Sequence, residues 1–275
     1  MSHYIFFNEK LLENETNVIS IHDRGLRYGD GLFETLRVFR RKIYQWSFHI
    51  ARLKNGLQTL GIYFDDWQKL NEIVQKVVDI NNIEEGILKI IITAGEKSQG
   101  YLRANNNKPN LIVEASQNKI SYKKPVEVII SQITKPAISS FPVNLKTLSS
   151  INSVMAKNEA HKKNYFDAIQ LDEKNIICEF SSGNIFWKKE EEVYTPSNKC
   201  SIIQGSIRDK ILKLSPIKVT EGEFKISNLK EAEEIFLTNV NHIVLPISYI
   251  ENLWEGKKFD FSEKLFNLIL ADIKR

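Results

Sequence analysis

The sequence predicts an α+β fold, in which strands and helices are mixed without the strict alternation of a doubly wound sheet. β-branched runs at residues 86–93 and 110–114 are typical of neighbouring strands. Apolar residues recur at helical spacing in residues 47–60 and 262–274. We find no internal repeat, and no apolar run approaches the roughly 18 residues that a membrane span needs.

The first third of the chain predicts a small set of strands and helices. The predicted elements are strands at residues 4–8 and 42–46, a helix at 47–60, a second helix capped by Asp65 and Asp66, and strands at 86–93 and 110–114. The stretch 95–109 is polar and rich in turn residues, so it predicts a long loop between the last two strands.

The remaining length predicts a second domain, since 275 residues correspond to one large domain or two ordinary ones. Residues 116–124, SQNKISYKK, carry few apolar side chains and predict a linker. We therefore expect a small N-terminal domain at 1–115 and a larger domain at 125–275. Its predicted elements are a strand at 126–133, a helix near 149–164, strands at 167–171 and 176–179, a hairpin of 185–188 with 192–195, a helix after Gly205, strands at 234–238 and 242–247, and a helix at 262–274.

Composition excludes several classes of function. The 38 basic and 34 acidic residues are interspersed, so the sequence predicts no nucleic-acid surface. The N-terminus lacks a basic region followed by an apolar stretch, so we expect no secretory signal. Cys178 and Cys200 lack the spacing of a metal site, and the five histidines are scattered. Two cysteines in a chain of this size favour a reduced compartment, the cytoplasm.

Three separated segments carry residues that suit a carbonyl cofactor. Lys146 ends an extended stretch before a predicted helix; alone it reads as a surface lysine, but a buried lysine can form a Schiff base. Such a cofactor also needs a carboxylate for a pyridinium nitrogen, and Glu179 ends a predicted strand. Gly205 precedes a predicted helix, where the N–H groups of Ser206 and Ile207 favour a phosphate. Taken alone, Glu179 is also consistent with an ordinary strand end, and Gly205 with an ordinary turn before a helix.

The order of these segments resembles the signature of the class IV aminotransferases, the fold type IV pyridoxal-phosphate enzymes. The matching residues are Glu179-x-Ser-x-x-Asn184-Ile-Phe, then Thr195, then Ile203-x-Gly-x-x-Arg208. Ser206 stands where the family usually has an aliphatic residue. In the N-terminal half, residues 22–38 resemble the family's substrate-side strand and residues 48–53 its first helix. The family contains branched-chain and D-amino acid aminotransferases and aminodeoxychorismate lyases.

The resemblance implies an enzyme with pyridoxal 5′-phosphate as its cofactor. Lys146 would hold the cofactor and then move protons, and Glu179 would pair with the ring nitrogen. The residues that would contact the phosphate are Arg52, Gly205, Ser206 and Ile207, and in a later turn Asn239 and Val240. The family places the cofactor between a small and a larger domain. Nearly all members are homodimers in which the partner supplies part of the substrate pocket.

Several positions favour the lyase among these reactions, which releases pyruvate and 4-aminobenzoate from aminodeoxychorismate. Residues 86–101 resemble the lyase pattern around that strand. Ile151 stands five residues after Lys146, where branched-chain aminotransferases carry a tyrosine. Thr35 stands where lyases can use a hydroxyl near the reacting carbons. We therefore expect a lyase that uses Lys146 and Thr35 in catalysis.

Other positions keep two alternatives open. Ala94 stands where the lyase loop typically has an arginine, and Arg103 is a candidate to replace that cation. Lys89 is either a substrate-side cation or a solvated strand lysine. A branched-chain or D-amino acid aminotransferase therefore remains the alternative. A cofactor-binding regulator without turnover is a third hypothesis, and the joint presence of Lys146, Glu179 and Arg52 argues against it.

Overall fold

The computed structural model describes residues 3–13, 18–105, 107–139 and 144–275, which fall into two compact units. The first unit is Met1–Ile120 with Leu145–Ser150, and the second is Ser121–Asn144 with Ile151–Arg275. Both combine helices with a sheet, which confirms the predicted α+β class. The first boundary, after Ile120, lies inside the predicted linker at 116–124.

The division differs from the predicted domains at the segment that carries the candidate reactive lysine. Leu145–Ser150 belongs to the first unit, although the sequence predicts it in the larger domain. The reason is backbone pairing with β3 (Gly31–Phe39), where the N–H of Phe33 donates to the carbonyl of Lys146 at 3.0 Å. Sequence periodicity reports only local structure, so it does not predict this long-range contact.

The sheet of the first unit is antiparallel, with the strand order β2-β1-β8-β5-β3-β4. The predicted loop at 95–109 contains a short hairpin, β6 with β7. The elements of this unit are β1 (Tyr4–Phe7), β2 (Lys10–Glu13), α1 (Arg24–Tyr28), β3, β4 (Lys42–Ile43), α2 (Trp46–Leu60), α3 (Trp67–Ile80), β5 (Glu85–Thr93), β6 (Ser98–Gln99), β7 (Leu102–Arg103) and β8 (Asn110–Gln117).

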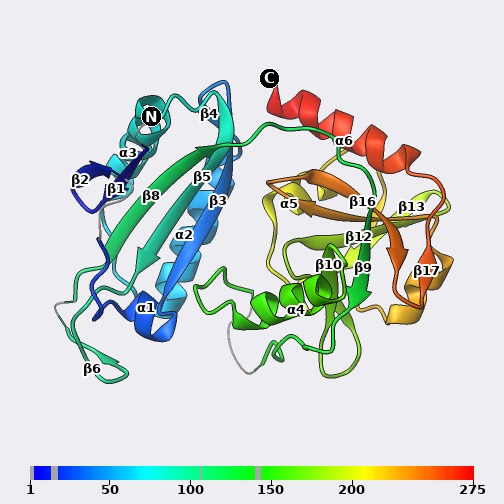
Figure 1. Cartoon of the computed structure of the whole chain (residues 1–275), viewed down its shortest axis with the longest axis horizontal. Helices are drawn as coiled ribbons and strands as arrows, with labels where there is room; N and C mark the ends of the chain where they lie inside the picture. Colours follow the sequence, from blue (N-terminus) through cyan, green and yellow to red (C-terminus); the bar gives the residue numbers. More distant parts are fainter. Residues whose placement is uncertain (1–2, 14–17, 106, 140–143) are drawn as a thin grey trace. The chain divides into compact units, whose positions relative to one another are not determined.

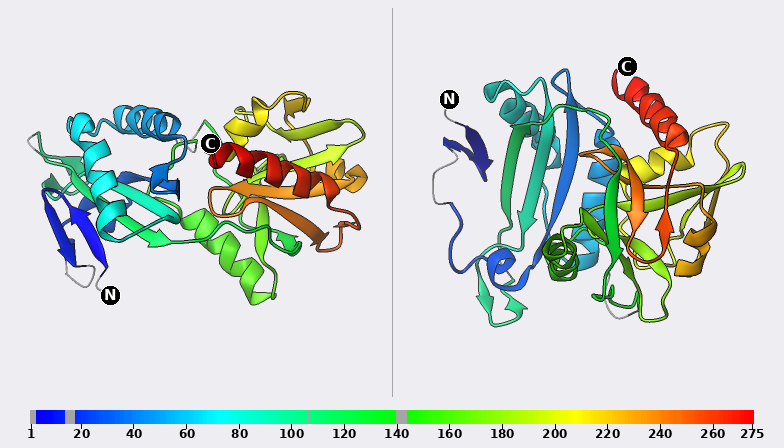
Figure 2. Two further views of the ribbon diagram at one scale, coloured as in Figure 1. Left: turned by 90° about the horizontal axis from the view of Figure 1, so that it is seen from above. Right: turned by 45° about the vertical axis from the view of Figure 1, so that its right-hand side comes forward.

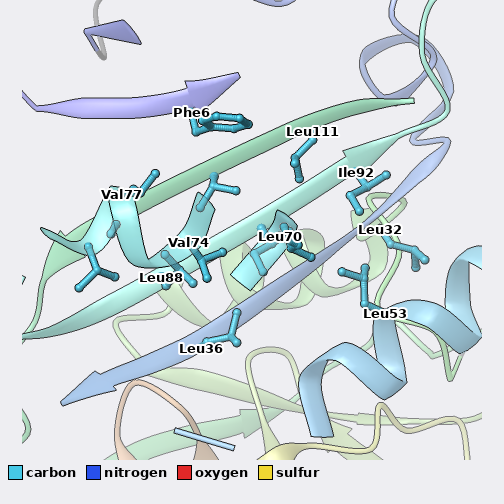
Figure 3. Close-up of a cluster of buried hydrophobic side chains, with 14 of the residues drawn as sticks. Phe6, Leu32, Leu36, Leu53, Leu70, Val74, Val77, Leu88, Ile92 and Leu111 are labelled. Atoms are coloured by element: carbon cyan, nitrogen blue, oxygen red, sulfur yellow. The ribbon is translucent and has the colours of Figure 1, made fainter. Parts of the chain in front are cut away.

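Helices α2 and α3 cover one face of this sheet (Figures 1 and 2). Leu36 and Leu88 point from the strands toward Leu70 and Val74 of α3, and all four are fully buried (Figure 3). Side chains alternate along a strand, so Thr35 points to the opposite face of the sheet from its neighbours. This alternation decides which site residues of β3 can act together.

The second unit contains a mixed sheet with the strand order β11-β10-β9-β16-β15-β12-β13-β14, and β17 pairs with β16. Its pairs are antiparallel except β9 with β10, β9 with β16 and β13 with β14. The elements are β9 (Val126–Ile130), α4 (Ile151–Lys162), β10 (Asp167–Leu171), β11 (Ile177–Phe180), β12 (Asn184–Lys189), β13 (Glu192–Pro196), α5 (Ser206–Leu212), β14 (Val219–Gly222), the 3₁₀ helix η1 (Ile226–Glu231), β15 (Glu234–Asn239), β16 (Ile243–Ile250), β17 (Trp254–Glu255) and α6 (Asp260–Ile273).

A buried carboxylate of β15 fastens the start of the last helix, α6, which packs along β16 and β15 (Figure 1). Glu234 accepts hydrogen bonds from the N–H of Phe261 at 2.7 Å and of Ser262 at 2.9 Å. The hydroxyl of Ser262 donates to the same carboxylate at 2.7 Å. These bonds satisfy N–H groups that the first turn of a helix cannot pair internally. Among the described residues, no helix is both long and apolar enough to cross a membrane.

We expect Glu234→Ala to lower the free energy of unfolding by about 1–3 kcal/mol, because two N–H groups at the helix start, that of Ser262 fully buried, lose their acceptor. Urea denaturation followed by circular dichroism measures this change. Glu255→Ala is the matched control, since Glu255 is exposed on the neighbouring β17. Equal stability of the two variants would contradict the role of Glu234 as a helix cap.

Candidate functional site

Glu179 lies at the centre of a buried polar cluster in the second unit. Its side chain, on β11, is 6% exposed, and its Oε1 accepts from Nζ of Lys135 at 2.6 Å. Its Oε2 accepts from Nδ2 of Asn184 and from the N–H of Ile203, both at 3.1 Å. A carboxylate has about four lone-pair directions. Three donors among the described residues therefore leave capacity for one more, such as a ring N–H.

Asn184 connects Glu179 to the start of α5. Its Nδ2 also donates to the carbonyl of Ile203 at 2.8 Å. Its Oδ1 lies 2.2 Å from where a Cβ at position 205 would be, so Gly205 is the residue that fits there. Gly205 is the N-cap of α5 and, as a glycine, has no side chain with which to cap this helix. The separated parts of the sequence signature therefore meet in one cluster.

The turn between β15 and β16 lies beside this cluster. Asn184 is directly opposite Thr238 in the pairing of β12 with β15, and α5 packs against β15. Nδ2 of Asn239 donates to the carbonyl of Ser182 at 3.0 Å, and its Oδ1 accepts from the N–H of His242 at 2.9 Å. The Asn239 side chain thus shapes the turn.

Thr238 adds a buried hydroxyl at the same place. The residue is 1% exposed, and its Oγ1 has no hydrogen-bond partner in the described part of the chain. Buried polar atoms in native proteins nearly always have a partner, so an unsatisfied hydroxyl indicates a place for a ligand or a water. The sequence prediction included the two residues after Thr238 but missed this one.

Lys146 and Thr35 lie on the same face of β3 in the first unit. Lys146 is opposite Phe33, and its Nζ lies 4.1 Å from the centre of the Phe33 ring. Thr35 is the next residue on that face, and two residues along a strand span roughly 7 Å. The structure thus brings the two predicted catalytic side chains to one side of the sheet.

Arg52 lies on the helix-covered side of β3 and is held by Glu34. Its Nε donates to Oε1 at 2.7 Å and its Nη2 donates to Oε2 at 2.6 Å. In the sequence, Leu53, Leu57 and Leu60 predict the inward face of this helix and so a free Arg52 side chain, but the pair with Glu34 contradicts that expectation. The apolar spacing places Arg52 outside the buried face of its helix. It cannot show that Glu34, on β3, lies within reach of the guanidinium. The bidentate pair fixes the plane of the guanidinium.

His49 is a site residue that the sequence analysis missed. Its Nδ1 lies 2.7 Å from Oε2 of Glu34, and the residue is fully buried. Burial lowers the pKa of His49 despite the opposing effect of Glu34. An ionised Glu34 only accepts, so Nδ1 carries the proton, and Nε2 has no partner among the residues described. The spacing of His49 and Arg52, three residues apart on one helix, was the available signal.

Lys89 and Arg103, the two candidate cations for the substrate, each contact a carboxylate of the first unit. Lys89 lies 3.7 Å from Glu114 with 41% of its side chain exposed, which supports the interpretation as a solvated strand lysine. Arg103 donates to Asp30 from Nε at 2.9 Å and from Nη2, and to the carbonyl of Leu60. Arg103 thus ties the β6–β7 hairpin to the end of α2.

The low pKa of Glu34 makes the free energy of unfolding depend on pH. Burial alone would raise this pKa, but Arg52 and His49 outweigh burial and lower it from 4.5 to about 2. A depressed carboxyl pKa contributes stability that is present above about pH 4.5 and lost as the pH falls toward 2. The shift corresponds to about 3 kcal/mol.

We therefore expect the unfolding free energy of Glu34→Gln to change less than that of the unmodified protein between about pH 6 and about pH 2.5. Urea denaturation at a series of pH values measures this slope. Glu84→Gln is the control, because Glu84 pairs with Arg41 at the surface. Parallel pH profiles for Glu34→Gln and the unmodified protein would show that the ionisation of Glu34 does not contribute to stability.

Comparison with known proteins identifies the family of this chain. A profile of the amino-transferase class IV family matches residues 31–250. The chain is 25% identical over 279 residues to D-alanine aminotransferase from Listeria monocytogenes serotype 1/2a (strain 10403S), covering 98% of this chain and 96% of that protein. It is 27% identical over 263 residues to aminodeoxychorismate lyase from Bacillus subtilis (strain 168), covering 92% and 89%.

A solved structure shares the fold. The branched-chain amino acid aminotransferase from Escherichia coli matches with a TM-score of 0.91 at 21% identity and covers 98% of this chain and 94% of that chain. This likeness confirms the predicted type IV fold. Because the family profile spans most of the sequence, the chain belongs to the class IV aminotransferase family.

Proposed function

We propose that the chain is a lyase that converts 4-amino-4-deoxychorismate to 4-aminobenzoate and pyruvate. Its family makes it a pyridoxal-phosphate enzyme, and its relatives include both aminodeoxychorismate lyase and D-alanine aminotransferase. The alternative is a transaminase of branched-chain or D-amino acids. The family resemblance favours a homodimer, and the unlinked Cys178 and Cys200 fit the cytoplasm.

The second unit fits a phosphorylated pyridine ring. Glu179 retains capacity for one donor, Gly205 lets Asn184 lie directly against the start of α5, and the buried Thr238 hydroxyl lacks a partner among the described residues. When bound, pyridoxal phosphate supplies a ring that disperses the electrons left on a substrate carbon. Glu179 would accept the ring N–H. The backbone from Ser206 to Ile207 and the turn at Asn239 and Val240 would hold the phosphate.

We assign the groups that move protons to the first unit. Nζ of Lys146 would bind the cofactor aldehyde and carry a proton to or from the substrate carbon. The Phe33 ring beneath it holds the ammonium in one place. Arg52 would add positive charge for the phosphate, with its plane fixed by Glu34. His49 completes that support by binding the same carboxylate.

The position of Thr35 carries the preference for the lyase. Thr35 follows Phe33 on the strand face where Nζ of Lys146 lies. A hydroxyl on the same strand face as the reactive lysine could pass a proton as the bond to the leaving group breaks. Ile151, at the start of α4, supplies no phenol where branched-chain aminotransferases have a tyrosine. Both residues favour elimination over transfer of the amino group.

We expect Lys146 to be the lysine that holds the cofactor. Borohydride reduction of the holoenzyme followed by peptide mapping identifies the modified residue. Lys89 is the internal control, because its Nζ also lies near Phe33, at 5.9 Å from the ring centre. A label on Lys89, or on another lysine, would show that Lys146 has a different role.

The reaction itself is tested by product release without a keto acid. We expect pyruvate and 4-aminobenzoate to form from 4-amino-4-deoxychorismate over many turnovers, because a lyase regenerates its cofactor aldehyde in each cycle. Lys146→Ala is the control and should release neither product. Chromatography of both products over time provides the measurement.

A transaminase gives a different result in the same assay. It stops after one conversion of its cofactor unless a keto acid is added, and it shows ping-pong kinetics with two substrates. Stoichiometric conversion by D-alanine or a branched-chain amino acid, with 4-amino-4-deoxychorismate left intact, would replace our proposal with the alternative.

A further inference from the structure

Lys135 contacts the carboxylate of Glu179, and the proposed reaction assigns it no task. Its Nζ lies 2.6 Å from Oε1, and the two side chains are 8% and 6% exposed. Removing both charges from water is costly, so such a pair persists only where the surrounding structure holds its geometry. The sequence analysis missed Lys135, because no local pattern distinguishes it from other lysines.

The backbone around Lys135 is fastened on both sides. Its N–H donates to the carbonyl of Leu171, at the end of β10, at 2.8 Å. The hydroxyl of Ser201 donates to the carbonyl of Pro136 at 2.8 Å. Glu179 is itself held by the pairing of β11 with β10. The ammonium and the carboxylate are therefore placed by the same sheet, and their contact belongs to the fold.

The contact between Lys135 and Glu179 determines the net charge next to a bound ring nitrogen. The carboxylate of Glu179 and the ammonium of Lys135 cancel, and the other donors, from Asn184 and Ile203, are neutral. A protonated ring N–H is attracted by the carboxylate and repelled by the ammonium that contacts Oε1. Nearby charges of opposite and like sign shift a proton affinity in opposite directions. Lys135 thus weakens the hold of Glu179 on the ring proton.

We propose that Lys135 is a positioning residue that offsets the charge of the Glu179 carboxylate and so limits how firmly the cofactor ring retains its proton. Through that proton, Lys135 sets the strength of the electron sink in the site. The inference rests on the proposed role of Glu179 as the partner of the ring nitrogen. It predicts that the charge of Lys135 affects ligands with a ring nitrogen and leaves others unaffected.

A pair of cofactors separates this effect from general damage to the site. The apoprotein is titrated with pyridoxal phosphate and with an analogue in which a C–H replaces the ring nitrogen. The quantity compared is the ratio of the dissociation constants, analogue over pyridoxal phosphate. We expect Lys135→Met to raise this ratio about tenfold, because the ring cation becomes the counter-ion of the buried carboxylate. A folding defect weakens both ligands and cancels in the ratio.

Three further variants complete the experiment. Lys135→Arg keeps the charge and should keep the ratio of the unmodified protein. Lys163→Met removes a lysine paired with Glu251 near the surface and should leave the ratio unchanged. Lys135→Gln, which is neutral and still donates a hydrogen bond, replaces Lys135→Met if that variant does not fold. It carries the same expectation of an increased ratio.

Glu179→Gln tests the premise separately. We expect it to lower the ratio toward one, because the ring nitrogen loses its anionic partner. An unchanged ratio would show that Glu179 does not contact the ring nitrogen, and it would reject the proposed cofactor site. A lowered ratio for Glu179→Gln, together with an unchanged or lowered ratio for the neutral Lys135 variants, would overturn the role of Lys135 alone.

Discussion

Backbone pairing between residues 145–148 and the edge of β3 is the constraint on which the site of the first unit depends. It sets Lys146 opposite Phe33, so the ammonium rests over an aromatic ring. A lysine side chain loses on the order of 2 kcal/mol of rotamer freedom when it is held in one place. The sheet imposes this order before a ligand arrives, and preorganisation of that kind lowers the cost of catalysis.

Each of the two units pairs a buried carboxylate with a cation. Glu34 meets the planar fork of Arg52, which contacts both of its oxygens, and His49 adds one neutral donor. Glu179 meets the single ammonium of Lys135, which contacts only Oε1. An arginine fork fixes the orientation of a carboxylate, whereas an ammonium acts as a point charge. Glu34 therefore has both oxygens engaged by the arginine, whereas Oε2 of Glu179 meets only neutral donors in the described part of the chain.

Several residues of the family signature hold the shape of the second unit. Oγ1 of Thr195 donates to the carbonyl of Ile185 at 2.8 Å and joins β13 to β12. Nη2 of Arg208 donates to the carbonyl of Pro196 at 2.8 Å and to Glu221. Residues that give the sequence its family likeness can therefore act at a distance from the chemistry, by fixing the backbone around α5.

Sequence alone determined the elements whose apolar spacing is strong, such as α2, α3, β5 and α6, because one buried face leaves a periodic record in the chain. It also proposed Lys146, Glu179 and Gly205 as site residues from their residue types and order, and it could not show how they are placed. Only the tertiary structure decided that Lys146 belongs to the first unit, that Glu34 holds Arg52 and that Lys135 contacts Glu179. Each of these contacts joins residues distant in the chain, so it depends on which strands and helices become neighbours, and no local pattern encodes that choice.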